Sequence, residues 1–240
     1  MLSEATLRLE FKKKLEEEKW FSPTGTGTTQ FKLLYQGTRD GMTPAAFHEK
    51  CDDKESTLVL IKAKEGDCVF GGYTGSGWFS PSVSSSRCWD HIPDPTCFLF
   101  HVVNPFGDPI TRMSAVSCDH YYYKPPYTMV CNGALGPWFG FHGEIVLRNT
   151  RFCRDEPFNH CKARLFLPPL PPPRCRRDDD DRVSMTFRDP LGRGHQAFVP
   201  PFVPPPPHGD DSEEDQDQDQ EGKFTLVELE VYSVSVSVSS

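Results

Sequence analysis

Cysteine and histidine residues stand close together at two places in the sequence, where a thiol nucleophile beside an imidazole base is conceivable. Cys51 follows His48 by three positions, and His120 follows Cys118 by two. A histidine that takes the thiol proton would activate the cysteine for reaction with a peroxide. Closeness in sequence does not bring two side chains together in a fold, and most free cysteines are small buried groups. A thiol-dependent antioxidant enzyme is therefore an alternative hypothesis, and no catalytic residue is assigned.

A metal site is conceivable in the second half of the chain. Cys153, His160 and Cys161 are candidate ligands, with His142 or Cys175 as a further one. Structural zinc sites usually contain a closely spaced pair such as Cys-x-x-Cys, and the sequence has no such pair. We therefore expect neither a metal ion nor a cofactor.

Two glycine-rich stretches resemble nucleotide-binding loops only superficially. Residues 71–77 contain four glycines, but Trp78 follows where a phosphate-binding loop requires Lys and Ser or Thr. Residues 25–30 contain Gly-x-Gly, but no strand precedes them and no third glycine follows. A bulge or a close backbone approach is the more common role of glycine beside a strand.

The charge of the chain is concentrated in its last third. Residues 1–167 carry 19 Lys and Arg against 19 Asp and Glu, whereas residues 168–240 carry 7 against 15. The main body therefore has no basic footprint that would predict nucleic-acid binding. No apolar run approaches the ~20 residues that span a bilayer, and Met1–Glu4 does not resemble the start of a secretory signal. Together with nine scattered cysteines, these features predict a soluble cytoplasmic protein without direct membrane insertion.

The elements that would position these residues begin with an amphipathic helix over residues 1–19. Leu7, Phe11 and Leu15 recur every four residues along it. An isolated helix of this length is marginal in water. We expect it to pack on the following domain, the alternative being the end of a coiled coil.

The body of the chain, from residue 20, reads mainly as short β-strands with a helix that begins after Thr43, an N-cap followed by Pro44. Two apolar runs around Glu65–Asp67 indicate a hairpin. The expected strands are Phe31–Tyr35, Thr57–Lys62, Cys68–Tyr73, Cys97–Val103, Tyr127–Cys131, Glu144–Leu147 and Phe224–Tyr232.

The composition changes sharply over residues 168–222. Twelve of the 23 prolines lie between Pro168 and Pro207, and Asp210–Glu221 holds eight acidic residues. Such a segment buries too little apolar surface to offset the entropy of ordering, so it predicts a disordered insertion before the last strand, with residues 235–240 as a tail. A second alternative hypothesis is a scaffold whose insertion binds a basic partner or an SH3- or WW-type domain.

Several segments, taken together in their order, resemble a TLDc domain over about residues 20–150 and 223–234. The resemblance begins with Phe31–Tyr35 and Gly37–Gly41, continues through Val69–Thr74, and ends with Phe224–Val231. The motif residues that carry it are Tyr35, Arg39, Asp40, Gly41, Phe70, Gly71, Gly72, Tyr73, Trp78, Gly136, Pro137, Phe139, Gly140 and Glu144.

The resemblance implies a two-sheet antiparallel β-sandwich with short flanking helices. It also implies a non-enzymatic protein-interaction domain that acts in protection from oxidative stress or in regulation of the vacuolar-type proton ATPase. The family has no agreed catalytic set, so the motif residues are expected to have structural or interaction roles. The glycines would allow close approach that a Cβ forbids.

Overall fold

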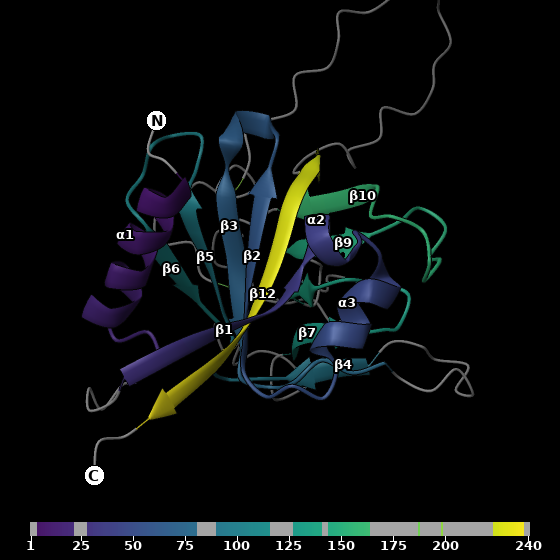
Figure 1. The fold of residues 1–240 in the computed structure, drawn as a ribbon, viewed down its shortest axis with the longest axis horizontal. Helices are drawn as coiled ribbons and strands as arrows, with labels where there is room; N and C mark the ends of the chain where they lie inside the picture. Colours follow the sequence, from purple (N-terminus) through teal and green to yellow (C-terminus); the bar gives the residue numbers. More distant parts are fainter. Residues whose placement is uncertain are drawn as a thin grey trace, which may run out of the picture.

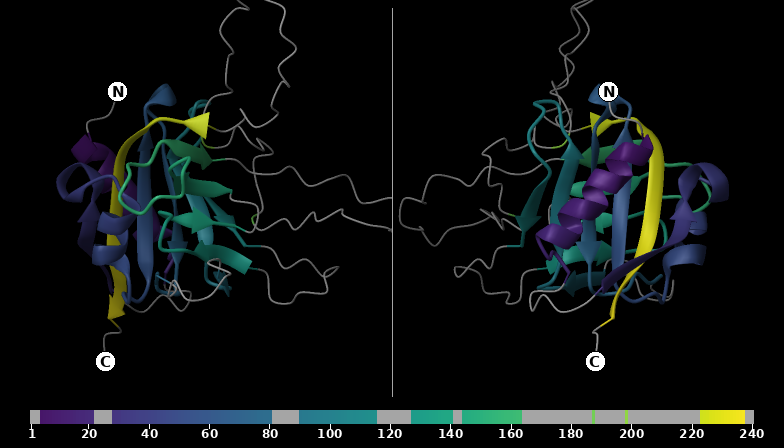
Figure 2. Two further views of the ribbon diagram at one scale, coloured as in Figure 1. Left: turned by 90° about the vertical axis from the view of Figure 1, so that its right-hand side faces the viewer. Right: turned by 60° about the vertical axis from the view of Figure 1, so that its left-hand side comes forward.

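The computed structural model describes residues 4–21, 28–80, 90–115, 127–140, 144–163, 187, 198 and 223–237, and of residues 4–9 and 127 only the backbone. Two antiparallel sheets of six strands each face one another in the described part of the chain (Figures 1 and 2). The predicted β-sandwich with few short helices is therefore confirmed.

The first sheet has the strand order β1-β12-β2-β3-β5-β6. Its bounds are β1 Thr28–Gln36, β12 Leu226–Ser237, β2 Thr57–Ala63, β3 Val69–Thr74, β5 Phe98–Val103 and β6 Thr111–Ser114. The predicted hairpin is present, because β2 pairs with β3 across a 3₁₀ turn at Glu65–Asp67. β12, the last strand in sequence, lies between β1 and β2 and so ties the end of the chain to its beginning.

The second sheet has the strand order β11-β10-β9-β8-β7-β4. Its bounds are β11 Lys223–Phe224, β10 His160–Ala163, β9 Ile145–Arg148, β8 Trp138–Phe139, β7 Tyr127–Cys131 and β4 Asp90–Pro93. The sequence predicted strands at β7 and β9 but not at β4, β8 or β10. β8 has only two residues, and β4 and β10 lack an apolar run such as Ile145–Leu147 of β9, so no pattern in the sequence marks these three strands.

The closing segment differs from the single strand predicted over Phe224–Tyr232. It divides at Thr225: Phe224 pairs with Cys161 in the second sheet, whereas Leu226 begins β12 in the first. β12 also continues to Ser237, three residues into the predicted tail of residues 235–240. The segment therefore crosses from one sheet to the other.

Three α-helices accompany the sheets in the described part of the chain: α1 Glu4–Glu17, α2 Gly37–Asp40 and α3 Pro44–Cys51. The hydroxyl of Thr43 accepts a hydrogen bond from the backbone N–H of Ala46 at 3.2 Å, as expected of an N-cap. No helix within the described ranges combines the length and apolar character that crossing a membrane would require.

The main core lies between the sheets. It contains Val59, Ile61 and Leu99 from the first sheet and Ile145 and Leu147 from the second, all fully buried. Two residues of the stretch predicted to be disordered also belong to this core. Phe187 is 2% exposed and Phe198 is fully buried with its ring 5.2 Å from that of Phe70. The remaining residues of 168–222 lie outside the described part of the chain.

A second core lies on the outer face of the first sheet, under α1 (Figure 2, right). Phe11 stacks on Phe100 with ring centroids 4.9 Å apart, and Leu15 is 3% exposed. Trp20, just after the helix, packs edge-on against Phe98 at 5.5 Å. Of the two arrangements that the sequence left open for this helix, the structure has the packed one.

Candidate functional site

Most of the motif residues are core residues. Phe70, Trp78 and Phe139 are at most 1% exposed, and they surround the glycines of the motifs. An added Cβ at Gly71 would lie 1.9 Å from the carbonyl oxygen of Val59 on the neighbouring strand. An added Cβ at Gly72 would lie 2.7 Å from the Phe139 ring of the opposite sheet. The two glycines thus set the spacing within one sheet and between the two.

The later motif is buried as well. Gly136 accommodates the Phe158 ring, which a Cβ would meet at 2.7 Å, and the neighbouring Pro137 is buried. Gly140 has a φ of +82°, and a Cβ there would meet the carboxylate of Glu144 at 1.6 Å. Glu144 itself is 2% exposed. These residues shape the interior, and Tyr73 stacks on Phe98 at 5.0 Å on the outer side of the first sheet.

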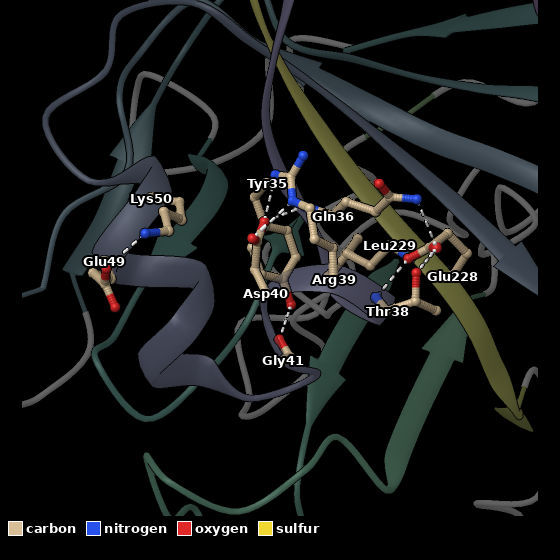
Figure 3. Close-up of polar contacts among 10 residues, drawn as sticks. All are labelled: Tyr35, Gln36, Thr38, Arg39, Asp40, Gly41, Glu49, Lys50, Glu228 and Leu229. Carbon is tan, nitrogen blue, oxygen red and sulfur yellow. Dashed lines mark hydrogen bonds and ion pairs between the residues drawn. The ribbon is translucent and has the colours of Figure 1, made fainter.

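The motif residues Tyr35, Arg39, Asp40 and Gly41 instead form a surface corner where β1 turns into α2 (Figure 3). Tyr35 is fully buried and donates its hydroxyl to the carbonyl of Gly41 at 2.6 Å. Asp40 accepts the backbone N–H of Gln36 at 2.9 Å, which holds the turn closed. Gly41, with a φ of +107°, ends the turn.

Arg39 carries the exposed charge of this corner. Its Nε and Nη2 atoms donate to the two carboxylate oxygens of Asp40 at 2.9 and 2.7 Å, while 52% of the side chain stays exposed. The hydrogen bond from Arg39 is the main reason that the pKa of Asp40 falls to about 2. This forked geometry fixes the plane of the guanidinium relative to the surface.

Glu228 completes the corner from β12. Its carboxylate accepts hydrogen bonds from the hydroxyl and backbone N–H of Thr38, the latter at 3.1 Å, and from the side chain of Gln36 at 3.2 Å. Burial would raise the pKa of Glu228, but these hydrogen bonds outweigh it and lower the pKa. We call Gln36, Thr38, Arg39, Asp40 and Glu228 the α2 corner.

The two carboxylates of the α2 corner are poorly suited to proton transfer at neutral pH. A general acid or base works best with a pKa near the working pH. The pKa values of Asp40 and Glu228 both lie below their ordinary values, so both carboxylates stay ionised at neutral pH. The Asp40 carboxylate holds the Arg39 guanidinium, and the Glu228 carboxylate is fixed separately by Thr38 and Gln36.

A second polar cluster is formed by His48 of α3 with Asp52 and Ser80. Its geometry shows whether His48 could activate Cys51. His48 is 2% exposed, with its Nδ1 2.6 Å from Asp52 and its Nε2 2.9 Å from the carbonyl of Leu135. The hydroxyl of Ser80 donates to the other oxygen of Asp52 at 2.7 Å. Both ring nitrogens of His48 are therefore engaged with oxygen atoms, so His48 is not placed to activate Cys51. Cys118 and His120 lie outside the described residues.

The described cysteines are mostly inaccessible. Cys51, Cys68, Cys97, Cys131 and Cys161 are buried, and Cys153 is partly exposed. Burial raises the pKa of Cys68 to about 11 and those of Cys131 and Cys161 to about 12. These buried thiols would be protonated and unreactive at neutral pH. Among the residues that the structure describes, no three His, Cys, Asp or Glu side chains are grouped as metal ligands would be.

Three members of the α2 corner are not among the predicted motif residues: Gln36, Thr38 and Glu228. Thr38 and Glu228 are 190 positions apart, so no spacing in the sequence joins them. The sequence feature that points to Glu228 is that glutamate recurs, as Glu228 and Glu230, among the apolar residues of the closing strand.

The fold and the motif residues define a two-sheet antiparallel sandwich whose signature glycines serve packing and whose α2 corner carries its exposed motif residue, Arg39. The family model described as the TLDc domain matches residues 10–169, two-thirds of the chain. The chain therefore belongs to the TLDc family. A comparison with curated proteins gave no match.

Proposed function

We propose that the chain is a non-enzymatic protein-interaction domain that acts in oxidative-stress protection or in regulation of the vacuolar-type proton ATPase. The observation that supports this best is the outward, oriented guanidinium of Arg39. It is the motif side chain that is more than half exposed, while its partners hold it in place. Arginine is enriched at the energetic centres of protein interfaces.

The mechanism would be binding that shifts an assembly equilibrium of the partner. A ligand shifts a two-state equilibrium only by its difference in affinity for the two states. A rigid surface suits this role, because little conformational entropy is lost when it binds. The hydrogen bonds that hold Asp40 and Glu228 supply that rigidity at the α2 corner.

The thiol-enzyme alternative has less support among the described residues, because five of their six cysteines are buried. The scaffold alternative rests on residues 168–222, which lie almost wholly outside the described part of the chain. Both stay as predictions for separate tests.

The test is ATP-driven proton pumping by isolated vacuolar-type ATPase membranes, with co-sedimentation of the purified chain. We expect the chain to bind and to change pumping, and Arg39→Ala to weaken binding by about tenfold or more. Lys12→Ala, an exposed cation on α1, is the matched control and should bind as the unaltered chain does. No binding by the unaltered chain, or equal loss in both variants, would contradict the proposal.

A further inference from the structure

The strands β1 and β12 continue together beyond the rest of the first sheet (Figure 1). β12 pairs with β2 only as far as Ser233, opposite Thr57, whereas it pairs with β1 as far as Ser237, opposite Thr28. The result is a two-stranded extension, residues 234–237 with residues 28–31, which we call the ribbon tip.

In the ribbon tip, one side of β12 has no strand paired with it among the residues that the structure describes. The N–H of Val234 donates to the carbonyl of Ser56 at 2.9 Å, so the backbone of Val234 faces the β2 side. Alternation along an antiparallel strand turns the N–H and C=O of Val236 to that same side. The pairing with β2 does not reach this far, because Thr57, the first residue of β2, lies opposite Ser233. No described strand pairs with Val236 there. An exposed ladder of this kind accepts an extended backbone as its partner.

The ribbon tip lacks the features that keep the other sheet edges from pairing. Natural edge strands are short, bulged, charged or interrupted by proline. β4 has four residues and ends in Pro93, β6 has four residues with Arg112, and β11 has only two. β1 carries Lys32 and a bulge between Leu33 and Tyr35.

The sequence of the ribbon tip is uncharged and repetitive. Val234 to Ser237 alternates valine with serine, and Thr28 to Phe31 of β1 holds no charge. In this alternation Val236 lies on the face of Val234, which belongs to the outer core, and Val236 is 37% exposed. An uncharged valine–serine alternation is self-complementary: two copies placed antiparallel bring valine beside valine on one face.

We propose that the ribbon tip pairs with the ribbon tip of a second copy of this chain, Val236 beside Val236, to form a dimer with two-fold symmetry. The pairing is isologous: the same side of β12 is buried in both copies, so no further copy can add and the assembly closes as a dimer. The contact is small, so the dimer is weak and forms at high concentration. It is separate from the α2 corner and does not depend on the proposed function.

The test is the mass of the purified chain in sedimentation equilibrium, from micromolar to millimolar concentration and with reductant to exclude disulfide linkage. We expect the average mass to rise toward twice that of one chain. Val236→Pro removes the N–H on the free side, and Val236→Lys brings two cations together at the symmetry axis. Both variants should stay monomeric, with thermal unfolding near that of the unaltered chain.

Val227→Lys is the matched control, because Val227 is also an exposed valine of β12, at 40% exposure, but lies at the opposite end of the strand. It should associate as the unaltered chain does. The proposal is overturned if the unaltered chain stays monomeric throughout, if the folded Val236→Lys variant associates equally well, or if the mass grows past a dimer without limit.

Discussion

At the scale of single residues, Gly71 is a position where backbone atoms of a neighbouring strand leave no room for a side chain. A Cβ there would lie 1.9 Å from the carbonyl oxygen of Val59, a backbone atom that the pairing of β2 with β3 holds in place. We expect Gly71→Ala to lower the free energy of unfolding by about 3 kcal/mol, at the upper end of overpacking effects. Urea denaturation measures this directly.

Gly133→Ala is the control for that substitution. The nearest atoms to a Cβ at Gly133 belong to Ser80 at 3.5 Å, an ordinary contact, and its φ is not in the left-handed region. Equal denaturation midpoints for the two variants would show that the close approach of β2 to Gly71 is not the reason for the glycine.

The residue scale also shows which roles could be read from sequence. The packing role of the motif glycines was predicted, because glycine beside a strand commonly marks a close backbone approach and the family resemblance implies the same. The hydrogen bond between Thr38 and Glu228 was not predicted, because only the crossing of β12 into the first sheet brings the two residues together. Similarly, the sequence offered His48 and Cys51 as a pair, whereas the fold turns His48 toward Asp52 and two backbone carbonyls.

At the scale of elements, α1 is part of the domain rather than an appendage. Phe11 is 6% exposed and stacks on Phe100 of β5. Truncating a buried aromatic side chain typically costs about 3 to 5 kcal/mol. We expect Phe11→Ala to lose about 3 kcal/mol in urea denaturation, and Lys12→Ala, on the exposed side of the same helix, to lose almost nothing. If Phe11→Ala left stability unchanged, the packed arrangement of α1 would be wrong.

Asp94 joins elements of the two sheets. It follows β4 of the second sheet, is 3% exposed, and accepts hydrogen bonds from Thr74 at the end of β3 and from the backbone N–H groups of Gly75 and Ser76. Its other oxygen accepts from the hydroxyl and N–H of Thr96, which leads into β5. Burial would raise the pKa of Asp94, but these hydrogen bonds prevail and lower it.

The lowered pKa of Asp94 makes the free energy of unfolding depend on pH. A carboxyl whose pKa is lower in the folded chain than in the unfolded chain stabilises the fold fully above its unfolded value, near 4. The contribution is lost as the pH falls through the folded value. We expect Asp94→Asn to cost about 3 kcal/mol at pH 7, because an amide hydrogen then faces donors, and to cost less near pH 3.

Urea denaturation at both pH values measures this difference. Asp90→Asn is the control, because Asp90 is an exposed carboxylate on the same strand β4. A cost for Asp94→Asn that stays constant between pH 7 and pH 3 would contradict the assignment of the effect to the ionised carboxylate.

At the scale of the whole molecule, the fold closes through a strand that the family match does not reach. The match covers residues 10–169, yet β12, which begins at Leu226, lies between β1 and β2. The sequence predicted that this segment returns to the sheet, because its alternation is strong. It could not predict the change of sheet at Thr225, because alternation reports which side chains face the interior and not which strand is the neighbour.

At the scale of the whole molecule, the reactivity of the buried thiols also reports whether the core has opened. Cys51, Cys68, Cys97, Cys131 and Cys161 are buried, the last four in β-strands or directly beside them. Thiol reagents attack the thiolate, which is scarce at neutral pH when burial raises the pKa to about 11 or more. Modification of these five cysteines therefore requires the sandwich to open.

We expect iodoacetamide at pH 7 to leave these five cysteines unmodified in the folded chain and to modify all of them in urea, as read by peptide mass spectrometry. Cys153, partly exposed in the connection between β9 and β10, should react at least about tenfold faster than any of them in the folded chain, in line with control of thiol reactivity by thiolate availability and access. Modification of a buried cysteine at the rate of Cys153 would contradict the closed core. The same experiment bears on the antioxidant hypothesis, because peroxide consumption that survives Cys153→Ser would have to come from Cys88, Cys118 or Cys175, outside the described residues.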